Sequence, residues 1–149
     1  MEICTNCPNV TLNSAKLYHN TTVYSWVKKE NVDDSYRFLL AILNSKLIWW
    51  FLKLTGDTLS SDTRRFKTEY LNPFPMPDTP EQLVIQKVEE TVELMMRAVA
   101  EDRDAAEIAS LERMLNLMVY KLYNLTLDEA HVVEPELECS EAEYERIFN

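Results

Sequence analysis

The sequence predicts a mostly α-helical (α+β) protein: a small strand-containing lobe with a helix pair, then a long antiparallel helical hairpin and a short C-terminal helix. Gly56 is the only glycine among 149 residues, and glycine is what many tight turns require. Apolar residues recur every three or four positions in segments 82–101 and 105–123, the period of amphipathic helices. One segment, 21–28, is β-branched and aromatic with rough alternation, which predicts a strand.

The predicted lobe spans residues 1–78 and begins with a polar, irregular segment over residues 1–20. Asp33 or Asp34 can cap a helix that starts near Ser35, because short polar side chains accept hydrogen bonds from the first backbone N–H groups. Its buried face consists of apolar residues, namely Leu39, Leu40, Ile42 and Leu43.

A second helix is predicted over residues 46–54, after an interruption at Asn44 and Ser45. Gly56 would end this helix at the position where a left-handed backbone is common. We expect a polar loop over 56–65, a short strand or turn over 66–70, and a proline-rich surface linker over 73–80.

The second predicted domain, residues 79–149, contains the helical hairpin and an acidic tail. Thr79 as the cap, Pro80 and Gln82 signal the start of its first helix. The predicted inner positions of this helix are Leu83, Val84, Val88, Val92, Met95, Met96 and Val99. A charged turn at 102–104 leads to the second helix, whose predicted inner positions are Ile108, Leu111, Met114, Leu115, Met118 and Leu122.

Two shorter helices are predicted after the hairpin. Thr126 is the expected cap of a helical turn over residues 127–131. Ser140 and Glu143 have the spacing of a capping box, in which cap and third residue satisfy each other's backbone N–H groups, for a helix over 141–148.

Charge divides the chain into two unlike halves. Residues 1–78 hold 9 Lys/Arg against 8 Asp/Glu, whereas residues 79–149 hold 6 against 17, within a net charge of −10. Phosphates repel an acidic surface, so any nucleic acid is expected to meet the N-terminal half. The alternative interpretation is that the acidic residues only keep the helices solvated.

Several function classes lack their residues in this sequence. Dinucleotide fingerprints and P-loops need several glycines, and no Ser/His/Asp triad or nuclease carboxylate–lysine cluster can be assembled. Cys4 and Cys7 have zinc-knuckle spacing, but no second ligand pair follows, so reduced thiols and no metal are expected. Polar residues interrupt the apolar run 38–54, so no membrane span is expected.

The best candidate for a binding function is the predicted loop 57–67. Arg64, Arg65 and Lys67 place three cations within four residues, beside Ser60, Ser61 and Thr63. Such side chains bind phosphate oxygens, and an arginine can bind guanine through two hydrogen bonds. Lys28 and Lys29 would extend this basic patch. The tryptophans at 26, 49 and 50 could stack on bases, but their apolar neighbours favour core packing.

The order LLAILNSKL … RRFKTEYLNPFPMP, with matches at 39–40, 42–47, 66–67, 70–71 and 73–77, resembles the C-terminal specificity region of TaqI-like adenine-specific DNA methyltransferases. Fused type II restriction–modification enzymes carry the same region. The segment LNLMVYKLYNLTLD, residues 115–128, resembles the tail that follows it, with Asn124 where the family often has glycine.

This resemblance implies a non-catalytic DNA sequence-recognition fragment, with double-stranded DNA and the methyltransferase domain of the same polypeptide as partners. It places S-adenosylmethionine in that other domain, because the cofactor loop and the (N/D)PP(Y/F) motif are absent from the sequence. We expect a cytoplasmic location and consider a homodimer possible. The competing hypothesis is a helical protein–protein interaction or dimerisation module without DNA binding. A type I restriction specificity subunit is a relative of the first hypothesis, but this chain has room for one recognition region at most.

Overall fold

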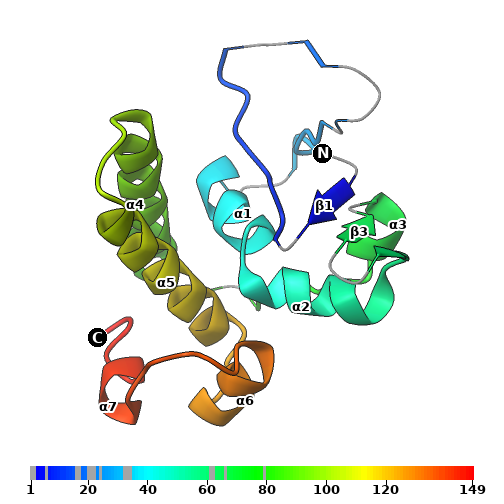
Figure 1. Cartoon of the computed structure of the whole chain (residues 1–149). Helices are drawn as coiled ribbons and strands as arrows, with labels where there is room; N and C mark the ends of the chain where they lie inside the picture. The colour runs from blue at the N-terminus through cyan, green and yellow to red at the C-terminus, as the bar shows by residue number, and fades with distance from the viewer. Residues whose placement is uncertain are drawn as a thin grey trace.

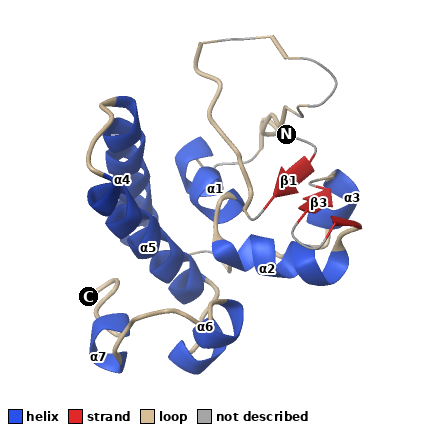
Figure 2. Ribbon diagram, viewed as in Figure 1, coloured by secondary structure: helices blue, strands red, loops and turns tan. Residues whose placement is uncertain are grey.

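A computed structural model describes residues 3–5, 7–15, 18–19, 23, 25–31, 35–60, 63–65, 67–78 and 80–149. Helices predominate beside one small sheet (Figures 1 and 2), which confirms the predicted α+β class. The strands are β1 (Ile3–Thr5), β2 (Thr58–Ser60) and β3 (Thr63–Arg65). The helices are α1 (Tyr36–Leu43), α2 (Lys46–Thr55), α3 (Thr68–Leu71), α4 (Gln82–Ala100), α5 (Ala105–Leu122), α6 (Leu127–Val133) and α7 (Glu141–Tyr144).

The elements form three groups across the molecule (Figure 1). The α4–α5 hairpin lies on one side, α1 and α2 occupy the middle, and the sheet with α3 lies on the other side. Helices α6 and α7 lie beyond the C-terminal end of α5. The helix pair therefore separates the acidic hairpin from the small sheet.

Serine side chains begin both helices of the central pair. The Ser35 hydroxyl accepts a hydrogen bond from Phe38 N–H at the start of α1, and the Ser45 hydroxyl accepts one from Ile48 N–H at the start of α2. Ser35 is thus the cap of α1, and the predicted caps Asp33 and Asp34 lie outside the described residues.

Gly56 follows α2 as predicted, but its backbone is extended, with φ −88° and ψ 156°. The expected left-handed helix end is therefore wrong. Close packing explains a small residue there, because a Cβ atom would lie 2.9 Å from the carbonyl oxygen of Leu52.

The sheet differs most from the sequence-based predictions. Its strand order is β1-β3-β2, with both neighbouring pairs antiparallel. Residues 25–28 of the predicted strand 21–28 have no regular structure, whereas β1 lies in the predicted irregular start and β2 and β3 lie in the predicted loop. Residues 68–71 form a helix of four residues where a short strand or turn was predicted over 66–70. Strand formation depends on a partner strand, which local propensity does not reveal.

The antiparallel hairpin of α4 and α5 is confirmed, and the cap predicted for α4, Thr79, lies outside the described residues. The predicted inner face of α4 is correct at Val88 and Val92, which are buried. Leu83, Met96 and Val99 are exposed, so the predicted inner face is wrong at these three positions. The last two turns of α5 are buried on nearly all sides, since α1, α2 and α6 pack near them as well as α4.

The two shorter helices follow their local signals to different extents. Thr126 and Glu129 form a complete capping box at the start of α6. Ser140 caps α7, but the side chain of Glu143 binds Arg113 instead of completing a box, and α7 ends at Tyr144, short of the predicted position 148.

Two hydrophobic clusters organise the interior. The larger joins α1 to α4, α5, α6 and α7, and the smaller joins Cys4 of β1 to Trp49 and Leu52 of α2. The larger cluster draws side chains from both sides of the predicted boundary at residues 78/79, and that boundary stays a prediction.

No single helix among the described residues is long and apolar enough to cross a membrane. Helices α1 and α2 together have the necessary length and composition, but the pair is bent by 56° at the break between them.

Candidate nucleic-acid interface

The candidate site is built on β3, the middle strand of the sheet. Arg64 pairs with Cys4 of β1 on one side and with Thr58 of β2 on the other. Residues directly opposite each other in antiparallel strands share a face, and successive residues alternate between faces. Arg64 and Arg65 are therefore directed to opposite sides of the sheet.

Arg64 lies on the inner face of the sheet. Its side chain shares that face with Cys4, and the two residues are only 9% and 4% exposed. One guanidinium nitrogen, Nη1, donates to the carbonyl oxygen of Thr63 at 3.1 Å. Burial of Cys4 against Trp49 and Leu52 raises the pKa of its thiol. A buried arginine in this position supports the packing of the sheet.

Arg65 lies on the outer face with Thr63 and, across the strand pair, Thr5. The hydroxyl oxygens of Thr5 and Thr63 are 3.2 Å apart, which shows that these two side chains meet on that face. Arg65 and Thr63 are half-buried, and Thr5 is exposed. This face therefore carries Arg65, whose Nε is buried, beside two hydroxyl groups.

Lys67 follows β3 and is the cap residue of α3, with an extended backbone at φ −99° and ψ 153°. Its ammonium nitrogen is 3.6 Å from Oε1 of Glu69, and its side chain is 27% exposed. A hydrogen bond to the Asp57 carboxylate raises the pKa of Tyr70 to about 12. Carboxylates thus border the basic residues and partly offset their charge.

The structure places Lys28 against α1. Its ammonium group lies over the Tyr36 ring at 5.1 Å from the centroid, and its backbone N–H donates to the Tyr36 hydroxyl at 3.3 Å. Lys29 is exposed. Neither lysine is on a strand, because residues 25–29 are irregular.

The tryptophans have the packing role that their apolar neighbours predicted. Trp49 is buried in the smaller cluster, while Trp26 and Trp50 are half-buried and pack against the smaller and larger clusters respectively. Tyr120 is fully buried and donates to a carboxylate oxygen of Glu134 at 2.9 Å. These rings therefore stabilise the interior.

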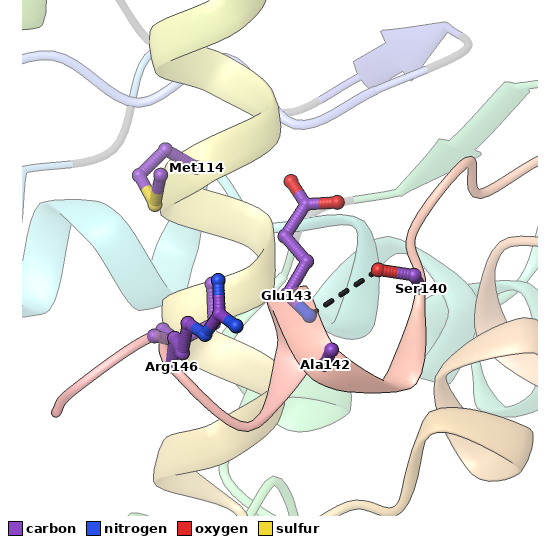
Figure 3. A pocket seen from close by; sticks show the side chains of 6 residues that line it. Met114, Ser140, Ala142, Glu143 and Arg146 are labelled. Carbon is purple, nitrogen blue, oxygen red and sulfur yellow. Dashed lines mark hydrogen bonds between the residues drawn. The ribbon is translucent and has the colours of Figure 1, made fainter.

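Two surface cavities lie on the hairpin side of the molecule. One, of about 280 Å³, is lined by Met114, Ser140, Ala142, Glu143, Arg146 and Ile147. Figure 3 shows the Glu143 N–H bonded to the Ser140 hydroxyl at its edge. The other, of about 290 Å³, contains an ion pair between Lys46 and Glu134 and lies beside Arg113, which pairs with Glu143. Lys46 and Arg113 at this cavity are therefore held in ion pairs with carboxylates of the same chain.

One serine–histidine pair is present that the sequence did not suggest. Nε2 of His19 is 2.6 Å from the Ser25 hydroxyl oxygen. Both side chains are exposed, and neither lines the two cavities described above. Covalent catalysis usually needs a protected site, so we assign this pair no catalytic role.

Comparison with known protein families identifies the part of the chain that carries the sheet. Residues 4–76 match the TaqI-like C-terminal specificity domain. No solved structure matches the chain. The matched segment includes β3 and all five basic residues singled out in the sequence, and it stops before α4. The family has a DNA-recognition role in methyltransferase and restriction enzymes. The resemblance of residues 115–128 to the family's tail lies outside this match and stays a prediction. Residues 4–76 of this chain are therefore a TaqI-like C-terminal specificity domain, which confirms the resemblance seen in residues 39–77.

Proposed function

We propose that this chain is the DNA sequence-recognition part of an adenine-specific DNA methyltransferase or of a fused restriction–modification enzyme, and that it performs no chemistry itself. The family match over residues 4–76 is the observation that carries this proposal. Its partners are double-stranded DNA and a methyltransferase domain of the same polypeptide. S-adenosylmethionine would bind in that other domain. The location proposed for the whole polypeptide is the cytoplasm.

The distribution of charge supports an orientation of the domain on DNA. The acidic α4–α5 hairpin lies on the far side of α1 and α2 from the sheet (Figure 1). Because the acidic residues 79–149, which comprise this hairpin and the segment after it, would be repelled by phosphates, the lobe with Arg65 and Lys67 is the part that meets DNA. The structure favours these two residues over Arg64, which is buried, and over Lys28, which packs on Tyr36.

Fluorescence anisotropy with a labelled mixed-sequence duplex at low salt tests DNA binding. We expect weak binding that falls steeply as salt is added, because few phosphates are reached. Arg65→Ala combined with Lys67→Ala should weaken it. Two variants serve as controls. Arg97→Ala removes one cation from α4, and the double variant Arg97→Ala with Arg103→Ala matches the loss of two cations. Absence of any binding by the parent chain at low salt would refute the proposal.

Adenine specificity needs a separate experiment. The reading frame that encodes this segment should also encode an (N/D)PP(Y/F) motif upstream, and the polypeptide spanning both should transfer a methyl group to adenine N6. Mass spectrometry of the digested DNA measures that product. Methylation of cytosine alone would refute the adenine assignment and leave the recognition role intact.

The second candidate is a helical interaction or dimerisation module. Its support is the set of exposed apolar side chains on α4, where Leu83, Leu94 and Val99 are 59%, 51% and 57% exposed. Size-exclusion chromatography with light scattering, with and without duplex DNA, distinguishes the two. A stable dimer that does not bind DNA would favour this candidate, whereas a change of mass on adding DNA favours recognition.

A further inference from the structure

The register of the sheet divides the two adjacent arginines between two roles. In this register Cys4 lies opposite Arg64, and Thr5 lies opposite Thr63. These pairings determine which side chains share a face. Cys4 and Arg64 face α2, where Cys4 packs against Trp49 and Leu52. The opposite face contains Thr5, Thr63 and Arg65. Only one arginine of the pair is thus directed away from the α2 core.

The outer face joins residues from distant parts of the chain. Thr5 belongs to β1 and Thr63 to β3, and their hydroxyl oxygens are 3.2 Å apart although 58 residues separate them. A hydroxyl group has one hydrogen to donate. When one threonine donates to the other, the second threonine keeps its hydrogen for an acceptor outside the pair.

This combination of groups matches the chemistry of a phosphate. Threonine hydroxyls and arginine guanidinium groups are among the side chains that bind phosphate oxygens in protein–DNA complexes. Arginine is suited to this contact because its planar group can donate two parallel hydrogen bonds to two oxygens of one phosphate. A hydroxyl hydrogen of the threonine pair can be donated to the same phosphate or to its neighbour along the strand.

We propose that the outer face of the sheet, formed by Thr5, Thr63 and Arg65, binds the phosphate backbone of duplex DNA, and that Arg64 instead holds the sheet on α2. This inference rests on the proposed DNA-recognition function and assigns its contact surface. It brings in Thr5 of the N-terminal strand and removes Arg64 from the set of DNA contacts. The face positions the domain on the duplex, and the sequence is recognised elsewhere on the lobe.

Salt-dependent DNA binding of the full 149-residue chain tests the assignment. Dissociation constants for a labelled mixed-sequence duplex are measured over a range of salt concentrations. Arg65→Ala should weaken binding about tenfold and reduce the salt slope by about one, as expected for a lost phosphate contact. Thr63→Val and Thr5→Val, which keep the branched shape, should each weaken binding by about threefold without changing the slope.

Arg97→Ala on α4 is the matched control for a change of one charge. We expect its DNA affinity to stay within about twofold of the parent affinity, because Arg97 is paired with Glu93 far from the sheet. Arg64→Met should lower the melting temperature followed by circular dichroism, while the folded fraction binds DNA with the parent affinity. If Arg64→Met unfolds the chain, Arg64→Lys serves for the same comparison.

The possible outcomes separate this inference from the proposed function. If the parent chain binds DNA and Arg65→Ala binds equally well, the assignment of the face is wrong and the recognition function stands. If Arg65→Ala weakens binding at an unchanged salt slope, a base contact replaces the phosphate contact and the inference is also wrong. If the parent chain does not bind at all, the proposed function itself fails.

Discussion

The side chain of Asn116 on α5 binds the first turn of α2: its Oδ1 accepts a hydrogen bond of 2.8 Å from the backbone N–H of Lys46, 70 residues away in the sequence. The first N–H groups of a helix have no partner within the helix. Ser45 satisfies one of them locally, and Asn116 satisfies another from a different helix. This contact fixes α2, and thereby the sheet, relative to the hairpin.

Replacing Asn116 by leucine should therefore destabilise the chain. Asn116 is 4% exposed, and its Nδ2 also donates to the Glu112 carbonyl at 3.0 Å. Leaving the partly buried Lys46 N–H without this acceptor costs about 1 kcal/mol, and the loss is measured as a lower free energy of unfolding in urea. Asn31→Leu, at an exposed turn, is the control and should change stability by less than about 0.5 kcal/mol. Equal effects would show that the helix-capping contact contributes nothing.

Asn124 determines how α5 ends. Its φ is 55°, in the left-handed region, and the Leu125 N–H donates to the Tyr120 carbonyl at 3.0 Å, as in a Schellman motif. Asn124→Ala should cost about 1 kcal/mol, since a Cβ without a polar side chain is disfavoured there, whereas Asn124→Gly should be neutral or stabilising. Thermal unfolding of both variants measures the difference. The reverse ranking would contradict the left-handed assignment.

The buried tyrosines should make the protein less stable in alkali. Burial raises the pKa of Tyr144 to about 12, and burial also raises the pKa of Tyr120. An unfolded tyrosine ionises near pH ~10, so between pH ~10 and 12 the unfolded state has lost a proton that the folded state retains. Stability is therefore complete below pH ~10 and falls as the pH rises through this window.

The midpoint of urea unfolding at several alkaline pH values tests this expectation. Tyr144→Phe should make the alkaline fall less steep, although losing the hydrogen bond to the Leu125 carbonyl lowers stability by about 1 kcal/mol at neutral pH. Tyr18→Phe, at a fully exposed position, should change neither quantity. A fall of the same steepness in Tyr144→Phe would assign the alkaline effect to other groups.

The cysteines report whether β1 is packed on α2. Cys4 is buried and burial raises its pKa, while Cys7 is exposed. Because the thiolate is the reactive form, brief alkylation of the native chain should label Cys7 at least tenfold faster than Cys4. Mass spectrometry of peptides measures the two rates, and alkylation in denaturant should make them equal. Equal rates in the native chain would mean that β1 leaves the sheet readily.

Most of the helical architecture could be predicted from the sequence because its signals are local. The three-and-four spacing predicted α4 and α5, and Thr126 predicted the start of α6, where it forms both capping hydrogen bonds with Glu129. The inner face of α4 was predicted less well. Leu83 and Val99 fit the apolar pattern but are exposed. The positions of the neighbouring helices decide which apolar residues of a helix are buried.

The candidate site was predicted as three cations in the loop 57–67, beside hydroxyl side chains, with Lys28 and Lys29 extending the patch. Arg64 and Arg65 are chemically identical neighbours, and the loop predicted for them gave no reason to separate them. Strand β3, placed between β1 and β2, buries the first and turns the second to the outer face. The threonine pair could not be predicted either, because β1 was expected to be irregular and Thr5 lies 58 residues from Thr63.

The sequence by itself determined the α+β class, the helical hairpin, the charge asymmetry and the family, because periodicity, capping residues and motifs are properties of nearby residues. The tertiary structure decided which residues pair as strands, which face of β3 is buried and which arginine lies on that buried face. Those outcomes depend on hydrogen bonds and packing between segments far apart in the chain, and no local pattern records such contacts.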